Sequence, residues 1–103
     1  MLFVVTARLA EGPEAEEKRA ALRPAHMQTV RAMAADGRMV LGGALMDGEK
    51  AGPASFAILD LPDRAALDAW LADHPYQTTG VWAAIGVATL SLAPVFTADR
   101  RRT

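Results

Sequence analysis

The sequence predicts a single α+β domain in which two helices cover one face of a four-stranded antiparallel sheet. The length of 103 residues suits one domain. The apolar content of 51% and the charged content of 22% are ordinary for a globular protein. Helical and strand-like segments also follow one another in the order strand, helix, strand, strand, helix, strand. This order is that of the ferredoxin-like βαββαβ arrangement.

The first half of the chain predicts a strand followed by a long helical region. Residues 2–8 are apolar and rich in β-branched types, so they predict the first strand. A run of acidic and basic residues at 14–19 then opens the helical region. We expect Pro24 to interrupt this helix or to restart it at a first-turn position, because proline lacks a backbone N–H. The main helix is expected over 25–35 and stops before Gly37.

The second half predicts a hairpin, a helix and a last strand. Strands at 39–45 and 55–59 are joined by a short polar turn, which favours antiparallel pairing. The second helix is expected to begin at Pro62, with Asp60 or Leu61 in the cap region. It should end at His74, because the proline that follows disfavours helical geometry there. The last strand is expected at roughly 83–92.

The predicted strands are apolar on both faces, which favours self-association. Phe3 and Val5 point to one face while Val4 points to the other, and the third and fourth strands repeat this pattern. Two helices cover only one face of the sheet. Leaving several hundred Å² of apolar surface in water would remove much of a small domain's stability. We therefore expect a homodimer, with two sheets packed face to face about a two-fold axis.

Composition narrows the classes of partner. The net charge of −1 suggests neither nucleic acid nor a membrane surface. The uncharged stretch 78–98 is too rich in Gly, Thr, Ser and Pro for a membrane span. No signal peptide is visible, so a cytoplasmic location is expected. We expect residues 1–97 to form the domain and 98–103 to form a basic, disordered tail.

His26 is the leading candidate for chemistry. It occupies an apolar position of the main helix, on the same face as Val30 and Met33. His74 is the second candidate, at the end of the second helix, and Asp73 is its neighbour. Histidines can hold or move a proton near neutral pH. For each one, a structural residue with a satisfied hydrogen bond is the alternative.

The remaining candidates concern binding. The Tyr76 hydroxyl could bind a ligand, although a packed loop tyrosine is the alternative. Gly42 and Gly43 suggest a bulge or a close approach near a cleft. The two tryptophans, Trp70 and Trp82, are expected in the core or an interface, with a stacking role as the alternative. The absence of cysteine excludes thiolate ligands, and the histidines and aspartate lack metal-site spacing, so no metal or cofactor is expected.

Four short motifs resemble the YCII family, also called YciI-like, of small bacterial proteins. The motifs are Arg23-Pro24-Ala25-His26, Gly37-Arg38-Met39-Val40 with Gly42-Gly43, His74-Pro75-Tyr76, and Gly80-Val81-Trp82. The resemblance implies a dimeric α/β barrel whose cleft holds a histidine and an aspartate as the active pair. His26 takes the place of the family histidine. The family aspartate stands directly before Pro-Tyr or Pro-Phe, where this chain has His74, so either His74 replaces it or Asp73 points inward.

Three hypotheses for function follow. In the first, His26 is the general base of a lyase, isomerase or hydrolase acting on a small molecule, with His74 or Asp73 as its partner. Arg23, Gly42, Gly43 and Tyr76 would then bind the substrate. In the second, the cleft binds a metabolite without chemistry. In the third, the chain is a structural or interaction dimer.

Overall fold

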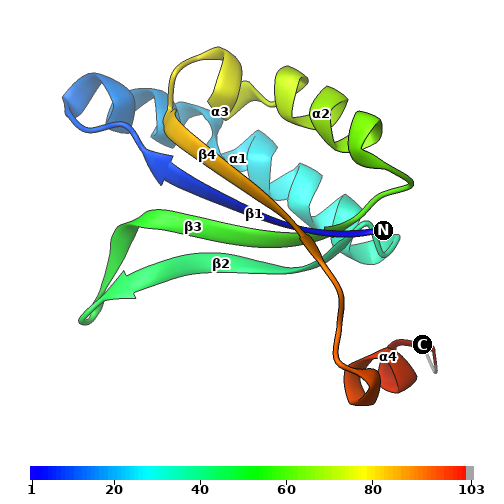
Figure 1. The fold of residues 1–103 in the computed structure, drawn as a ribbon. Coiled ribbons are helices and arrows are strands. Elements are labelled where there is room, and N and C mark those ends of the chain that lie inside the picture. The colour runs from blue at the N-terminus through cyan, green and yellow to red at the C-terminus, as the bar shows by residue number, and fades with distance from the viewer. Residues whose placement is uncertain (102–103) are drawn as a thin grey trace.

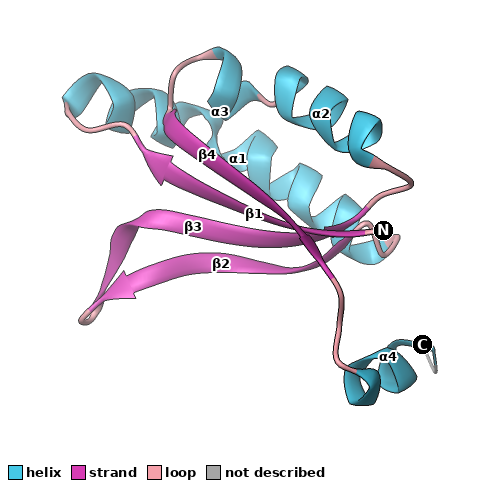
Figure 2. Cartoon of the chain, in the orientation of Figure 1, coloured by secondary structure: helices cyan, strands magenta, loops and turns pink. Residues whose placement is uncertain are grey.

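The computed structural model describes residues 1–101, and residues 102–103 lie outside the described part of the chain. Its elements are, in chain order, β1 (Leu2–Leu9), α1 (Pro13–Ala35), β2 (Met39–Asp47), β3 (Lys50–Asp60), α2 (Arg64–Asp73), α3 (Pro75–Thr78), β4 (Trp82–Leu90) and α4 (Pro94–Arg101). The strands form one antiparallel sheet in the order β2-β3-β1-β4. Helices α1, α2 and α3 lie on one face of that sheet (Figures 1 and 2). The predicted α+β, ferredoxin-like fold is confirmed.

Helix α1 runs without a break through Pro24, so the predicted interruption or restart is wrong. Proline at this position removes one helical hydrogen bond, the one to the Ala20 carbonyl. Both residues are exposed, so water can satisfy that carbonyl. Packing of later turns, through Val30 and buried Met33, holds the helix on the sheet. The helix ends as predicted before Gly37, whose φ of 84° is easily adopted only by glycine.

The β2–β3 hairpin is longer than predicted. The expected polar turn at 47–53 is mostly strand, and the strands are joined through Gly48, with φ of 65°, and Glu49. The register shifts between Ala44 and Met46, where β3 carries the extra residues. Such a bulge accommodates Pro53, which has no N–H for a regular ladder.

The second helix begins two residues later than predicted. Its N-cap is Asp63, whose Oδ1 accepts a hydrogen bond from the N–H of Ala66 at 2.8 Å. Asp60 instead ends β3 and forms an ion pair with the N-terminal amine at 3.2 Å. The helix stops at His74 as predicted, because this residue is extended, with φ of −66° and ψ of 129°. The last strand is shorter than the expected 83–92, and neither α3 nor α4 was predicted.

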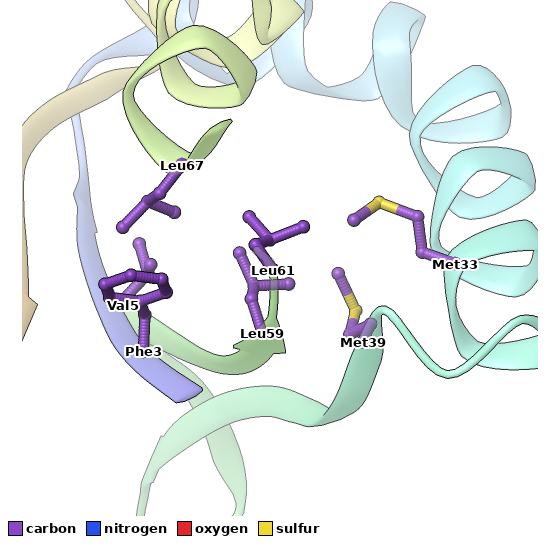
Figure 3. Close-up of a cluster of buried hydrophobic side chains, with 7 residues drawn as sticks. All are labelled: Phe3, Val5, Met33, Met39, Leu59, Leu61 and Leu67. Atoms are coloured by element: carbon purple, nitrogen blue, oxygen red, sulfur yellow. The ribbon is translucent and has the colours of Figure 1, made fainter. Parts of the chain in front are cut away.

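The hydrophobic core fills one end of the layer between the helices and the sheet. The pairing of Phe3 with Leu59 and of Val5 with Ala57 puts these side chains on the helix-covered face. Leu67 of α2 closes the cluster from above (Figure 3). The buried cluster comprises Phe3, Val5, Met33, Met39, Leu59, Leu61 and Leu67. These contacts anchor α1 and α2 and so position the other end of the layer.

The opposite face of the sheet carries apolar side chains without a helix over them. Val4 pairs with Ile58, and Ile58 pairs with Leu41, so all three share this face. Leu41 is 48% exposed. Helix α4 lies away from α1 and α2, beyond the end of β4 (Figure 1). Within residues 1–101, no helix has the length and apolar character that crossing a membrane requires.

Candidate functional site

A cavity of about 330 Å³ lies between α1 and the β2–β3 side of the sheet. It exists because the helix-facing residues of these strands are small. Gly42 pairs with Ala57 and Ala44 pairs with Ser55, and all four line the cavity. A side chain at Gly42 would bring its Cβ to 3.2 Å from the Phe56 carbonyl oxygen. Large side chains fill the core end of this layer, whereas these small ones leave space at the other end.

One face of α1 forms the opposite wall of the cavity. Arg19, Arg23, His26 and Val30 follow one another at intervals of four, three and four residues, so they share this face. The face therefore changes along the helix from two cations to an imidazole and then to an apolar side chain. The predicted site residues Gly42 and Gly43 lie across the cavity from it.

His26 is half-buried, and its Nδ1 is buried without a hydrogen-bond partner among the described residues. Its ring stacks on Tyr76, with centroids 4.6 Å apart and an angle of 28° between the planes. The edge of the His74 ring approaches from another side, at 5.2 Å between centroids. A buried polar atom without a partner is rare in proteins and calls for an explanation, of which a catalytic role is one.

His74 is buried, with 5% of its surface exposed. Its Nδ1 accepts a hydrogen bond from the backbone N–H of Tyr76 at 3.0 Å and thereby caps α3. An accepting Nδ1 carries no proton, so the neutral ring holds its proton on Nε2. The ring stacks on Trp82 at 4.2 Å and meets the edge of Trp70 at 5.1 Å. His74 thus occupies the position before Pro-Tyr as a neutral acceptor held by aromatic packing.

Asp73 lies on the exposed side of this cluster. It does not line the main cavity but borders a second hollow that it shares with His26, His74 and Thr29. No hydrogen bond or ion pair joins Asp73 to His26 within residues 1–101. The residue brought against the His26 ring is therefore His74 and not the carboxylate.

Burial and positive charge keep both imidazoles neutral. Burial lowers the pKa of His26, and the guanidinium groups of Arg23 and Arg19 lower it further. Burial, and to a smaller extent the charge that His26 carries once it is protonated, lowers the pKa of His74 to about 4. Burial raises the pKa of Tyr76, and the two arginines oppose that rise. At neutral pH both histidines are thus uncharged, beside two cations.

The structure brings most of the predicted site residues together. Arg23, His26, Tyr76 and the glycine pair line the main cavity, and His74 contacts two of them. Within the described chain, no group of three or more His, Asp or Glu side chains is arranged to hold a metal ion.

The sequence interpretation missed two features of this region. Arg19 lines the cavity, and its spacing of four residues from Arg23 was the available signal. Trp82, which we had expected in the core or an interface, lines the cavity and stacks on His74. The period-2 pattern of its strand carries no information on that contact.

Comparisons with known proteins establish the family and the fold. The YCII-related domain matches residues 1–91, so the chain belongs to this family. A 5-chloro-2-hydroxyhydroquinone dehydrochlorinase from Burkholderia phenoliruptrix, solved in complex with 2,5-dihydroxybenzoquinone, has a similar structure, with a TM-score of 0.73 and 18% sequence identity. The match covers 90% of this chain and 96% of the dehydrochlorinase.

A more distant structural neighbour is an antibiotic biosynthesis monooxygenase. It matches with a TM-score of 0.51 and 20% identity, over 91% of this chain and 100% of that one. No functionally curated protein matches the sequence significantly. At these identities the two structures establish the fold, which is that of the dimeric α/β-barrel proteins.

Proposed function

We propose that this protein is an enzyme that moves a proton on a small organic molecule bound between α1 and the sheet. The observation that carries the proposal is the buried, unpartnered Nδ1 of His26 beside a cavity of about 330 Å³. A cavity of this size accommodates a single substituted ring. The lowered pKa of His26 keeps it in the neutral form that a general base needs at neutral pH.

The neighbouring residues would hold this base in position. Tyr76 stacks on the His26 ring, and the edge of His74 limits its rotation. His74 is itself held by the backbone of Tyr76 and by Trp82. We assign His74 a positioning role, because a pKa of about 4 leaves it without a proton to give as an imidazolium near neutral pH.

A lyase, isomerase or hydrolase reaction fits this arrangement, and chloride elimination is the first reaction to test. The structural neighbour is a dehydrochlorinase of a hydroxylated aromatic ring. In such a reaction His26 would first move a proton from a ring hydroxyl to the carbon that carries chlorine, which gives the keto tautomer. It would then take a proton from a second hydroxyl, whose electron pair would form a second carbonyl and shift through the ring as the C–Cl bond breaks. Chloride and the protonated imidazole are then the products beside the ring, which balances charge and atoms.

The working unit in this proposal is a homodimer. The uncovered sheet face carries Val4, Leu41 and Ile58, and the fold is shared with dimeric α/β-barrel proteins. A second copy on this face would remove its apolar surface from water. The cytoplasmic location expected from the sequence stays a prediction.

A binding module without catalysis is the second candidate, and one observation favours it. His26 has no carboxylate partner among the described residues, since Asp73 is exposed and His74 is neutral. A carboxylate would stabilise the imidazolium that forms during proton transfer, as in other His-based sites. Without it, the cavity could bind a ring and leave it unchanged.

Chloride release from chlorinated hydroquinones distinguishes the two candidates. The wild-type protein should release chloride, and His26→Gln should lower the rate about 10²-fold or more. Gln28→Ala is the matched control, because Gln28 is exposed on α1 and does not line the cavity. Equal rates for wild type and His26→Gln would refute His26 as the base. Binding without chloride release, or any other conversion of the ring, would favour the binding module.

A further inference from the structure

The main cavity carries two cations that the proposed proton transfer does not use. Arg19 and Arg23 both line it, one helical turn apart on α1. None of the described residues that line the cavity is an aspartate or a glutamate. Within residues 1–97 neither guanidinium forms an ion pair, whereas Arg38 and Arg64 each pair with an aspartate.

This arrangement opposes helix stability. Like charges four residues apart on a helix repel each other, and no ion pair within residues 1–97 offsets this repulsion. The effect of both charges reaches the site, because they lower the pKa of His26 and oppose the rise at Tyr76. The whole chain has a net charge of −1, so these cations do not reflect a generally basic protein. Local departures from stability of this kind are typical of functional sites.

The rest of the cavity suits a ring. Its wall is formed by apolar and aromatic side chains, among them Val5, Val30 and Trp70. An apolar chamber with a few convergent charged groups at one end is the usual form of a small-molecule site. Guanidinium groups bind a planar oxyanion by paired, charge-assisted hydrogen bonds.

We infer that the ligand of this cavity is a monocyclic organic anion, whose ring oxygen or carboxylate charge is bound by Arg19 and Arg23. This inference rests on the cavity used in the proposed function but not on His26 acting as a base. Arg23 was expected from the sequence to bind substrate, and the inference adds Arg19 and the charge of the ligand. The two arginines orient the ring, and the anion in turn relieves their mutual repulsion.

Two probes that share a nitrophenyl ring but differ in charge test the inference. 4-Nitrophenol above its pKa supplies a phenolate, and 4-nitroanisole supplies the same ring as a neutral methyl ether. Their affinities for the full-length protein are measured by calorimetry. The phenolate should bind about tenfold more tightly or better, since one charge-assisted hydrogen bond is worth at least that factor. Equal affinities, or no phenolate binding up to millimolar concentration, would overturn the inference.

Three variants test which arginines of α1 bind the negative charge of the ligand. Arg19→Gln and Arg23→Gln should each weaken phenolate binding about tenfold and leave the ether unchanged. Arg31→Gln is the control, since Arg31 is exposed on α1 and does not line the cavity. An equal loss in Arg31→Gln would mean general attraction by the helix and would count against a site. Circular dichroism establishes that each variant is folded.

The ionisation of the probe provides a second readout. Neighbouring guanidiniums favour the anion, so 4-nitrophenol bound near its own pKa should turn into the yellow phenolate, and less so in Arg23→Gln. Loss of turnover in His26→Gln with phenolate binding intact would support both proposals. Phenolate binding by a wild-type protein that turns over no substrate would leave this inference standing and the proposed enzyme refuted.

Discussion

The Nδ1 atom of His74 accepts a hydrogen bond from the backbone N–H of Tyr76 at 3.0 Å. This bond caps α3, the short helix that presents the Tyr76 ring to His26. His74 stands where the family has an aspartate. It keeps a hydrogen-bond acceptor at this position but supplies no negative charge. Several predictions about stability and proton binding depend on this one contact.

The first prediction concerns the cap itself. His74→Leu removes the acceptor and leaves the N–H of Tyr76 unpaired, so the free energy of unfolding should fall by about 0.5–2 kcal/mol. His74→Asn keeps an acceptor near the position of Nδ1 and should lose less. Urea denaturation of the three proteins gives the comparison. A more stable His74→Leu protein would show that the hydrogen bond does not stabilise the fold.

The second prediction concerns charge. His74→Asp puts a carboxylate beside His26, and a negative charge raises the pKa of a neighbouring imidazole. The pKa of His26, followed by NMR of its ring C–H groups, should therefore rise relative to wild type. Asp68→Asn is a control, because Asp68 is exposed and pairs with Arg64 away from the site. An unchanged or lower His26 pKa in His74→Asp would contradict the arrangement of the two rings.

The third prediction follows from the lowered pKa values of both histidines. The folded pKa of His74 is about 4, against an ordinary value of 6.5, so between these values the unfolded chain binds more protons. The stabilisation is complete above about pH 6.5 and is lost as the pH falls toward 4. His26, whose pKa is also lowered, acts in the same direction.

Urea denaturation at about pH 7.5 and about pH 5 measures this loss. Wild type should be clearly less stable at the lower pH, and the double variant His26→Gln, His74→Asn should lose less. The comparison between the two proteins removes the contribution of the carboxylates, which they share. An equal loss of stability in both proteins would mean that protonation of the two histidines does not lower the free energy of unfolding.

The fourth prediction concerns the volume of the cavity. Ala44 is exposed, lines the cavity and faces α1, so Ala44→Leu should fill part of the space and weaken ring binding at least about tenfold. The fold should tolerate the change, because no buried neighbour has to move. Leu45→Met, on the other face of the strand, is the matched control. Unchanged binding in Ala44→Leu would place the ligand elsewhere.

The fifth prediction concerns the uncovered sheet face. Leu41→Lys places a charge where a second copy would pack, so it should shift the protein from dimer to monomer. Analytical ultracentrifugation measures the molecular mass, and Gln28→Lys on the exposed side of α1 is the control. A monomeric wild type would contradict the proposed assembly, as would a Leu41→Lys protein that stays dimeric at low concentration.

The fold was predictable because strand and helix periodicities are local properties. The alternation of Phe3, Val4 and Val5 gave both faces of the sheet, and the stripe through His26 gave the side of α1 that faces the cavity. The errors fell where one local signal competed with packing. Pro24 weakens a helix, yet the packing of the turns around it keeps the helix continuous.

The sequence predicted which residues form the candidate site better than it predicted the contacts between their side chains. The positions of His26 and Tyr76 follow from their elements, but their stacking depends on α3, a turn of helix that Pro75 begins and His74 caps. The tautomer of His74 depends on one backbone N–H in that turn. Such tertiary details lie outside the reach of spacing patterns.

The most direct test of the account is an NMR titration of His26 in the free protein and in the presence of 4-nitrobenzoate, a ring carboxylate that stays ionised throughout the titration. The free protein should give a His26 pKa below 6.5, and the ligand should shift its ring resonances and raise that pKa by neutralising the arginines. A pKa at or above 6.5 in the free protein, with resonances that do not respond to the ligand, would contradict a neutral imidazole facing an anion-binding cavity.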